Sequence, residues 1–452
     1  MQDLHGLALS TPCAAAADAF NRTLRSYLGY RTDISEHLKT TLKADPSFAL
    51  AHCAKGYFMM LTYKQANVAV AAEACNTARG LAGEATPRER AHVRALAAWI
   101  AGDLDGAIGA WEETLRACPT DVLAMRLAHF NYFWLGRARD MRASIERIAG
   151  SWSPELAGYG TLLGCHAFAL EECGDYAAAE RAGREAIARD PADLWATHAV
   201  AHVLEMQGRR EEGIAFLLGM ERHWAQGNNL VHHLWWHRAM FHLERNELDV
   251  VLDLYDRRIR DLASPLVTAQ PDLYIDVQNA ASMLFRLERL GVAVGGRWAE
   301  LADKAQARVG DCLSAFTLPH WMMALAAAGR ESAAEHMLRD MRAYGGGAAT
   351  TAPLVRDVAV PLCEAILHHR RGDYEQTVQL MRPILGDMHR LGGSHAQQDV
   401  LEQLFLDAAM RAERADAVRF VLERVTASHP VPPGRRAGYA DATRRYSAGP
   451  LH

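Results

Sequence analysis

Several features that would direct a functional assignment are missing from this sequence. Its 452 residues include only eight cysteines, and no two of them form a C-x-x-C pair. This pattern is typical of free thiols in a reducing compartment. No apolar run is long enough to cross a bilayer, and the opening residues MQDLHGLALSTPCAAAADAF lack the basic and apolar regions of a signal peptide. We therefore expect a cytoplasmic protein without membrane contact.

An excess of positive charge is also missing. The chain has 49 Lys and Arg against 54 Asp and Glu, a formal net charge of −5. Neither nucleic acid nor an anionic membrane is therefore an expected partner. The sequence has no Gly-rich phosphate loop, Ser-His-Asp pattern, zinc-finger spacing or redox cofactor motif. No cofactor is expected with certainty, and a redox reaction is expected only if a metal supplies it.

The features that are present indicate a helical repeat. No segment alternates as a β-strand does, whereas short turn signals recur along the chain. The glycines Gly102, Gly136, Gly174 and Gly208 are separated by 34, 38 and 34 residues. A spacing near 34 with helix–turn–helix content is typical of tetratricopeptide-type repeats.

This periodicity predicts an all-α fold. We expect a tetratricopeptide-like α-solenoid of about ten helical pairs, closed into a superhelix with an inner cavity. Residues 1–428 are predicted to form a single continuous solenoid, and residues 429–452 a Pro/Gly/Arg-rich extended tail.

Histidines are concentrated in two consecutive repeats. In the repeat at 194–227, His198, His202 and Glu205 occupy first-helix positions that usually face the concave groove. Their spacings of four and three place them on one helical stripe. The stretch NNLVHHLWWHRAMFHLE (228–244) continues the pattern with His233 and His237, again four residues apart.

Stacked repeats would bring several such side chains toward one inner channel, and they form our candidate site. The candidate acid–base residues are His198, His202, Glu205, His237, His395 and Asp399. The candidate substrate-binding residues are His166, Glu172, His233, Trp236, His320 and Gln397.

These residues also have plainer interpretations. A single histidine in a solenoid is usually a core or capping residue, and tryptophans such as Trp236 more often fill gaps between helices. The H-x3-H-x2-E spacing of His198, His202 and Glu205 could hold a divalent metal, although the sequence does not define the complete ligand set. A metal-free cluster, in which a carboxylate sets the histidine tautomer, is the alternative.

Four motifs carry a resemblance to a known family. They are WATHAVAHVLEMQGRREEG (195–213), HHLWWHRAMFHLE (232–244), LYDRRI (254–259) and GGSHAQQDVLEQL (392–404). With them the chain resembles the tetratricopeptide repeat protein 38 family from about residue 15 to 428.

The resemblance implies a closed α-solenoid and a soluble intracellular protein, and it implies no reaction. Its signature positions are His198, His202, His233, His237, His395 and Asp399. Gln398 stands where relatives often carry arginine. If that arginine pairs with an anionic ligand, the ligand of this protein is expected to differ.

Two classes of function remain open. In the first, the inner pocket binds a small molecule and catalyses a non-redox reaction of the hydrolase or lyase type (hydrolysis, hydration or elimination). This reaction would proceed with or without the help of a metal ion. In the second, the solenoid is a scaffold that binds a peptide or partner protein in its concave groove. Peptide grooves favour Asn, Lys and Arg, whereas these candidate residues are His, Glu, Trp and Asp, a composition that favours the pocket.

Overall fold

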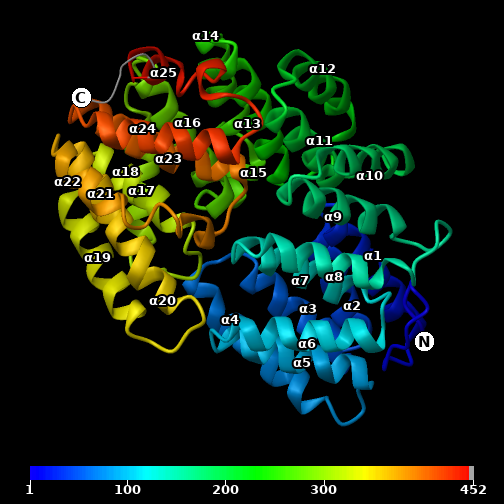
Figure 1. The fold of residues 1–452 in the computed structure, drawn as a ribbon. Helices are drawn as coiled ribbons and strands as arrows, with labels where there is room; N and C mark the ends of the chain where they lie inside the picture. The colour runs from blue at the N-terminus through cyan, green and yellow to red at the C-terminus, as the bar shows by residue number, and fades with distance from the viewer. Residues whose placement is uncertain (447–452) are drawn as a thin grey trace. The chain divides into compact units, whose positions relative to one another are not determined.

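Helices form nearly all the regular structure of this protein. The computed structural model describes residues 1–446, and Figure 1 shows its helices following one another along the chain. Within these residues the only extended pairings are two isolated bridges, Gln2 with Ala8 and Arg31 with Gly227. The predicted all-α, tetratricopeptide-like helical repeat is confirmed.

The chain divides into two compact units. Unit 1 comprises residues 1–200, 220–230 and 348–350, and unit 2 comprises residues 201–219, 231–347 and 351–452. The boundary falls inside helix α11 (Leu194–Met206). One continuous, closed solenoid therefore stays a prediction, and we describe each unit by itself.

Unit 1 is built from antiparallel helix pairs. Each odd-numbered helix packs on the even-numbered helix that follows it. The helices are α1 (Ala14–Leu28), α2 (Ile34–Ala44), α3 (Ala49–Met60), α4 (Gln65–Gly80), α5 (Pro87–Ile100), α6 (Leu104–Ala117), α7 (Val122–Trp134), α8 (Ala138–Ala149), α9 (Tyr159–Glu172) and α10 (Tyr176–Arg189).

The turns within these pairs explain the repeat signal. Gly174 has a φ of 82° after α9, in the left-handed region that suits glycine. The next residue, Asp175, accepts a hydrogen bond from the backbone N–H of Ala178 and so caps α10. The same Gly-Asp turn joins α5 to α6, where Gly102 and Asp103 take these roles.

Unit 2 contains the later helices, apart from the end residues of α12 and α13. They are α12 (Arg210–Met220), α13 (Leu230–Glu244), α14 (Leu248–Leu254), α15 (Pro265–Ala269), α16 (Tyr274–Arg289), α17 (Arg297–Ala307), α18 (Thr317–Ala327), α19 (Glu331–Gly345), α20 (Ala352–Leu354), α21 (Val360–Arg370), α22 (Tyr374–Met381), α23 (His395–Arg411), α24 (Ala415–Ser428) and α25 (Ala440–Tyr446). Helices far apart in sequence also meet: α16 packs on α23.

The C-terminal segment is folded where the structure describes it. Residues 433–435 form a 3-10 turn, and α25 contacts α24. Arg436 and Tyr439 are both buried and both bond to Asp399 of α23. The expectation of an extended tail did not anticipate these contacts, and residues 447–452 lie outside the described part of the chain.

Among residues 1–446, no helix is both long enough and apolar enough to cross a membrane.

Candidate functional site

Three of the predicted histidines come together in unit 2. His202 lies on α11, and His233 and His237 lie one turn apart on α13. Their ring nitrogens approach within 4.8 Å of one another. The ring of His237 stands edge-on to the other two, with centroid distances of 4.3 Å to His202 and 4.7 Å to His233. We call these three residues the histidine cluster.

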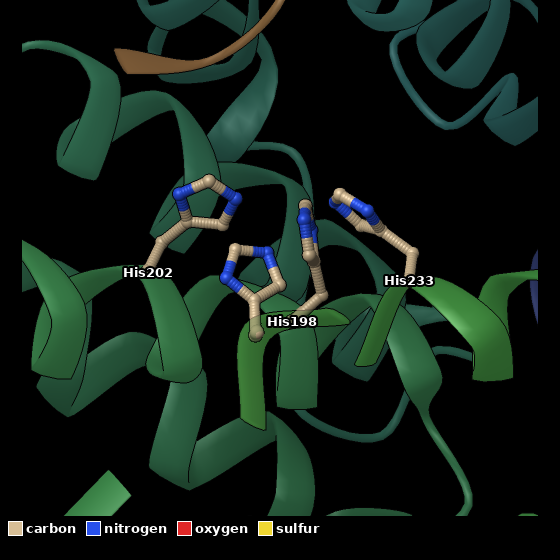
Figure 2. Close-up of side chains that lie close together, drawn as sticks. His198, His202 and His233 are labelled. Atoms are coloured by element: carbon tan, nitrogen blue, oxygen red, sulfur yellow. The ribbon is translucent and has the colours of Figure 1, made fainter. Parts of the chain in front are cut away.

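Figure 2 labels His202 and His233 of the histidine cluster. It also labels His198, which precedes His202 by one turn of α11. The predicted stripe on this helix is therefore present, since residues four apart share a face. His198 belongs to unit 1, on the other side of the boundary within α11.

The histidine cluster is buried. His202 and His237 are 0% exposed and His233 is 2% exposed. Burial lowers the pKa of His237 to about 3, and it also lowers the pKa values of His202 and His233 well below the ordinary value. All three imidazoles are therefore neutral near pH 7.

Hydrogen bonds orient two of the rings. Nδ1 of His237 lies 2.6 Å from a carboxylate oxygen of Glu205 on α11. Nδ1 of His233 lies 2.9 Å from Oδ1 of Asn279 on α16. Burial raises the pKa of Glu205 to about 8. The contact between Glu205 and His237 is thus a hydrogen bond between two groups that are mainly neutral at pH 7, and not an ion pair.

Helix α16 supplies the other partners of α13. Nδ1 of His232 lies 3.3 Å from Asp276, and Trp236 donates from Nε1 to Oγ of Ser282 over 3.2 Å. Sequence reasoning missed Asp276, Asn279 and Ser282. Their spacing of three was a usable signal, because it places three polar side chains along one face of the helix.

Asp399 is held in a network of its own. Its oxygens accept hydrogen bonds from Arg436 and Tyr439 at 2.6 Å each and from Gln403 at 2.7 Å. Burial alone would raise the pKa of Asp399, but the guanidinium groups of Arg436 and Arg286 hold it well below its usual range. Asp399 is therefore an ionised carboxylate whose oxygens are already used by the protein.

The space beside these groups is small. Within the described part of unit 2, Glu205, His395 and Asp399 line one cavity of about 30 Å³. Such a volume has room for about two water molecules. Three of the predicted residues meet at this cavity, but the predicted catalytic pocket is not supported.

The remaining candidates have local roles. His320 bonds through Nδ1 to the carbonyl of Phe316 on its own helix. Gln397 forms a capping box with Ser394 at the start of α23. Trp236 stacks on His233, with their ring planes 10° apart.

Two predicted residues belong to unit 1. His166 lies on α9 with Nε2 3.6 Å from Glu146 of α8, and Glu172 is the last residue of α9. The predicted metal triad consisted of His198, His202 and Glu205. In the structure the carboxyl group of Glu205 lies at Nδ1 of His237 instead, at 2.6 Å.

Unit 1 contains a larger opening, which sequence reasoning missed. A cleft of about 480 Å³ lies between the end of α1, the loop before α9, the α10–α11 turn and residues 223–227. One wall is closed by backbone pairing, in which Asn228 donates to the carbonyl of Tyr30 and Thr32 donates to that of Gln226. We call this opening the unit 1 cleft. Three arginines line it: Arg25, Arg31 and Arg189.

Comparisons with known proteins yield distant likenesses. No protein-family model matches the chain. The human IFIT1 dimer with PPP-AAAA is similar over 96% of this chain and 94% of that chain, at 11% identity and a TM-score of 0.42. A Naa15/Naa10 structure bound to HypK-THB is similar over 96% and 73%, at 12% identity and a TM-score of 0.25. The P58(IPK) TPR domain is similar over 89% and 99%, at 10% identity and a TM-score of 0.20. At these scores the likeness carries no inference about ligand, partner or reaction.

Proposed function

We propose that this chain is a helical-repeat binding protein whose unit 1 cleft receives an acidic segment of a partner protein. The observation that carries the proposal is the cleft itself, with about 480 Å³ of space and three arginines in its lining. The cavity that Glu205, His395 and Asp399 line measures about 30 Å³.

The charges of the cleft favour an anionic occupant. Arg25 and Arg31 are exposed, whereas Arg189 already pairs with Glu185 at 3.0 Å. The lining also contains two carboxylates, and each accepts backbone hydrogen bonds. Asp193 accepts from the N–H groups of Trp195 and Ala196, each at 2.9 Å, and the exposed Asp190 accepts from that of Ala192 at 2.9 Å. Arginine is well suited to carboxylates because its planar donors match their geometry.

The openness of the cleft favours a peptide segment over a small molecule. Small-molecule sites usually enclose most of the surface of their ligand. Here Arg25, Arg31 and Arg189 are exposed side chains at the margin of the cleft. A segment of a longer chain can lie across such an opening and contact several arginines in turn.

We also propose a family and a cellular location for this protein. The motifs at 195–213, 232–244 and 392–404 support membership of the tetratricopeptide repeat protein 38 family. The scattered cysteines, all of which are free thiols, support a cytoplasmic location.

Charge reversal at the cleft tests the function. Fluorescence polarisation with labelled Asp/Glu-rich peptides should detect binding that weakens as salt is added, because exposed charges are screened. The double variant Arg25→Glu/Arg31→Glu should reduce the affinity by at least about tenfold, equivalent to about 1.4 kcal/mol. Arg22→Glu is the matched control, since Arg22 is an exposed arginine of the same helix outside the cleft lining.

Two outcomes would contradict the proposal. An equal loss in Arg22→Glu would show that only overall charge matters. Tight binding of small carboxylates, with no binding of any acidic peptide, would instead support a small-molecule site.

A further inference from the structure

The histidine cluster of unit 2 is chemically unusual for a packing core. Three imidazoles from two helices lie against one another, with His237 between His202 and His233. Burying polar rings costs free energy that apolar side chains of similar size would not cost. A purely structural core could use leucine or phenylalanine if the partners Glu205 and Asn279 were apolar as well. This arrangement calls for a role that requires imidazole nitrogen.

We propose that His202, His233 and His237 bind one divalent transition-metal ion of the zinc type. Three imidazoles with a fourth position for another ligand are an established donor set for such ions. The proposal concerns unit 2 alone, and it stands or fails independently of the unit 1 cleft.

The distances are compatible with coordination after a small adjustment. Two nitrogens on one tetrahedral zinc ion, each at 2.0–2.1 Å, are about 3.4 Å apart. The nitrogens of the histidine cluster lie within 4.8 Å of one another. The largest gap to close is thus about 1.4 Å, which modest rotation of the side chains can supply.

The surroundings of the rings match those of metal-binding histidines. Such a histidine commonly donates its second ring N–H to a carboxylate or carbonyl oxygen, which fixes its orientation. Glu205 stands at Nδ1 of His237, and Asn279 stands at Nδ1 of His233. These oxygen partners come from α11 and α16, so two different helices support the two rings of α13.

Titration with Co²⁺ and Zn²⁺ tests the proposal. The full-length protein is freed of metal with a chelator and titrated with Co²⁺, whose visible absorption reports tetrahedral coordination. We expect saturation at one Co²⁺ per chain, displacement by Zn²⁺ and a higher melting temperature in the presence of Zn²⁺. Absence of saturable Co²⁺ binding by the unaltered protein would overturn the proposal.

Variants assign the site to these residues. His202→Gln and His237→Gln should abolish stoichiometric binding. His232→Gln should retain it, because His232 is a buried neighbour on α13 that bonds to Asp276. Glu205→Leu leaves the three ligands in place but removes the oxygen at Nδ1 of His237, and it should weaken binding by about 10–100-fold, which keeps the test informative if a ligand variant fails to fold. Equal loss in His232→Gln and His237→Gln would refute the assignment.

Discussion

The buried histidines of α13 each have a defined partner at Nδ1. His232 faces Asp276, His233 faces Asn279, and His237 faces Glu205. In a buried environment a polar group that loses its partner costs about 1–3 kcal/mol. These residues therefore contribute to stability whatever else they do, and a functional test must separate the two effects.

Replacement of His237 by glutamine should destabilise the metal-free protein. Glutamine can replace only part of the hydrogen bonding at Glu205, and we expect a loss of about 1–3 kcal/mol. The measurement is the thermal or urea unfolding midpoint in the presence of chelator. His336→Gln serves as control, because His336 is exposed on α19, and should change stability by less than about 0.5 kcal/mol. Equal midpoints for His237→Gln and the parent would show that the bond to Glu205 is not stabilising.

Pairs of helices in this protein meet through small residues. Gly213 of α12 faces Phe241 of α13, and a Cβ added at Gly213 would lie 2.3 Å from the ring. Gly219, on the same helix, has nothing within 4 Å of an added Cβ. Glycine is therefore required at one position for close packing and not at the other.

The substitution Gly213→Ala should separate α12 from α13. Overpacking of this kind typically costs about 1–3 kcal/mol, which should appear as a lower melting temperature and faster amide exchange in both helices. Gly219→Ala, the matched control, should be neutral or stabilising by up to about 1 kcal/mol, because alanine favours helix over glycine. A similar melting temperature for the two variants would contradict the close contact.

At the scale of the whole molecule, ionised carboxylates tie distant segments together. Asp399 joins α23 to the C-terminal segment through Arg436 and Tyr439. Asp407, which lies nearer the C-terminal end of the same helix, is also ionised. Burial alone would raise its pKa, but the hydrogen bond from His369 and the charge of Arg289 lower it to about 2. Such groups make stability depend on pH.

Acid should therefore destabilise the protein through these carboxylates. Because the pKa of Asp399 is lower in the folded chain than in the unfolded chain, its contribution is complete above the unfolded value of about 4 and is lost as the pH falls below it. The variant Asp399→Asn should melt below the parent at pH 7, and the difference should shrink between about pH 5 and pH 3. Exposed Asp18→Asn is the control and should follow the parent at every pH. A difference that does not change with pH would contradict this account.

The sequence by itself determined the helices and their pairing. Gly-Asp turns such as Gly174–Asp175 act locally, because glycine permits the left-handed backbone and aspartate caps the next helix. The spacing of His233 and His237 also places them on one face without reference to the rest of the chain. Helix formation depends on bonds between residues four apart, so a local pattern is sufficient to predict it.

Only the tertiary structure decided which polar groups meet and how much space remains. Asn279 reaches His233 across 46 residues of sequence, and Arg436 reaches Asp399 across 37 residues. The cavity beside Glu205 measures about 30 Å³, while the unit 1 cleft arises where residues 226–228 pair with residues 30–32. Such contacts depend on how whole helices pack against one another, and no periodicity within a single helix encodes that placement.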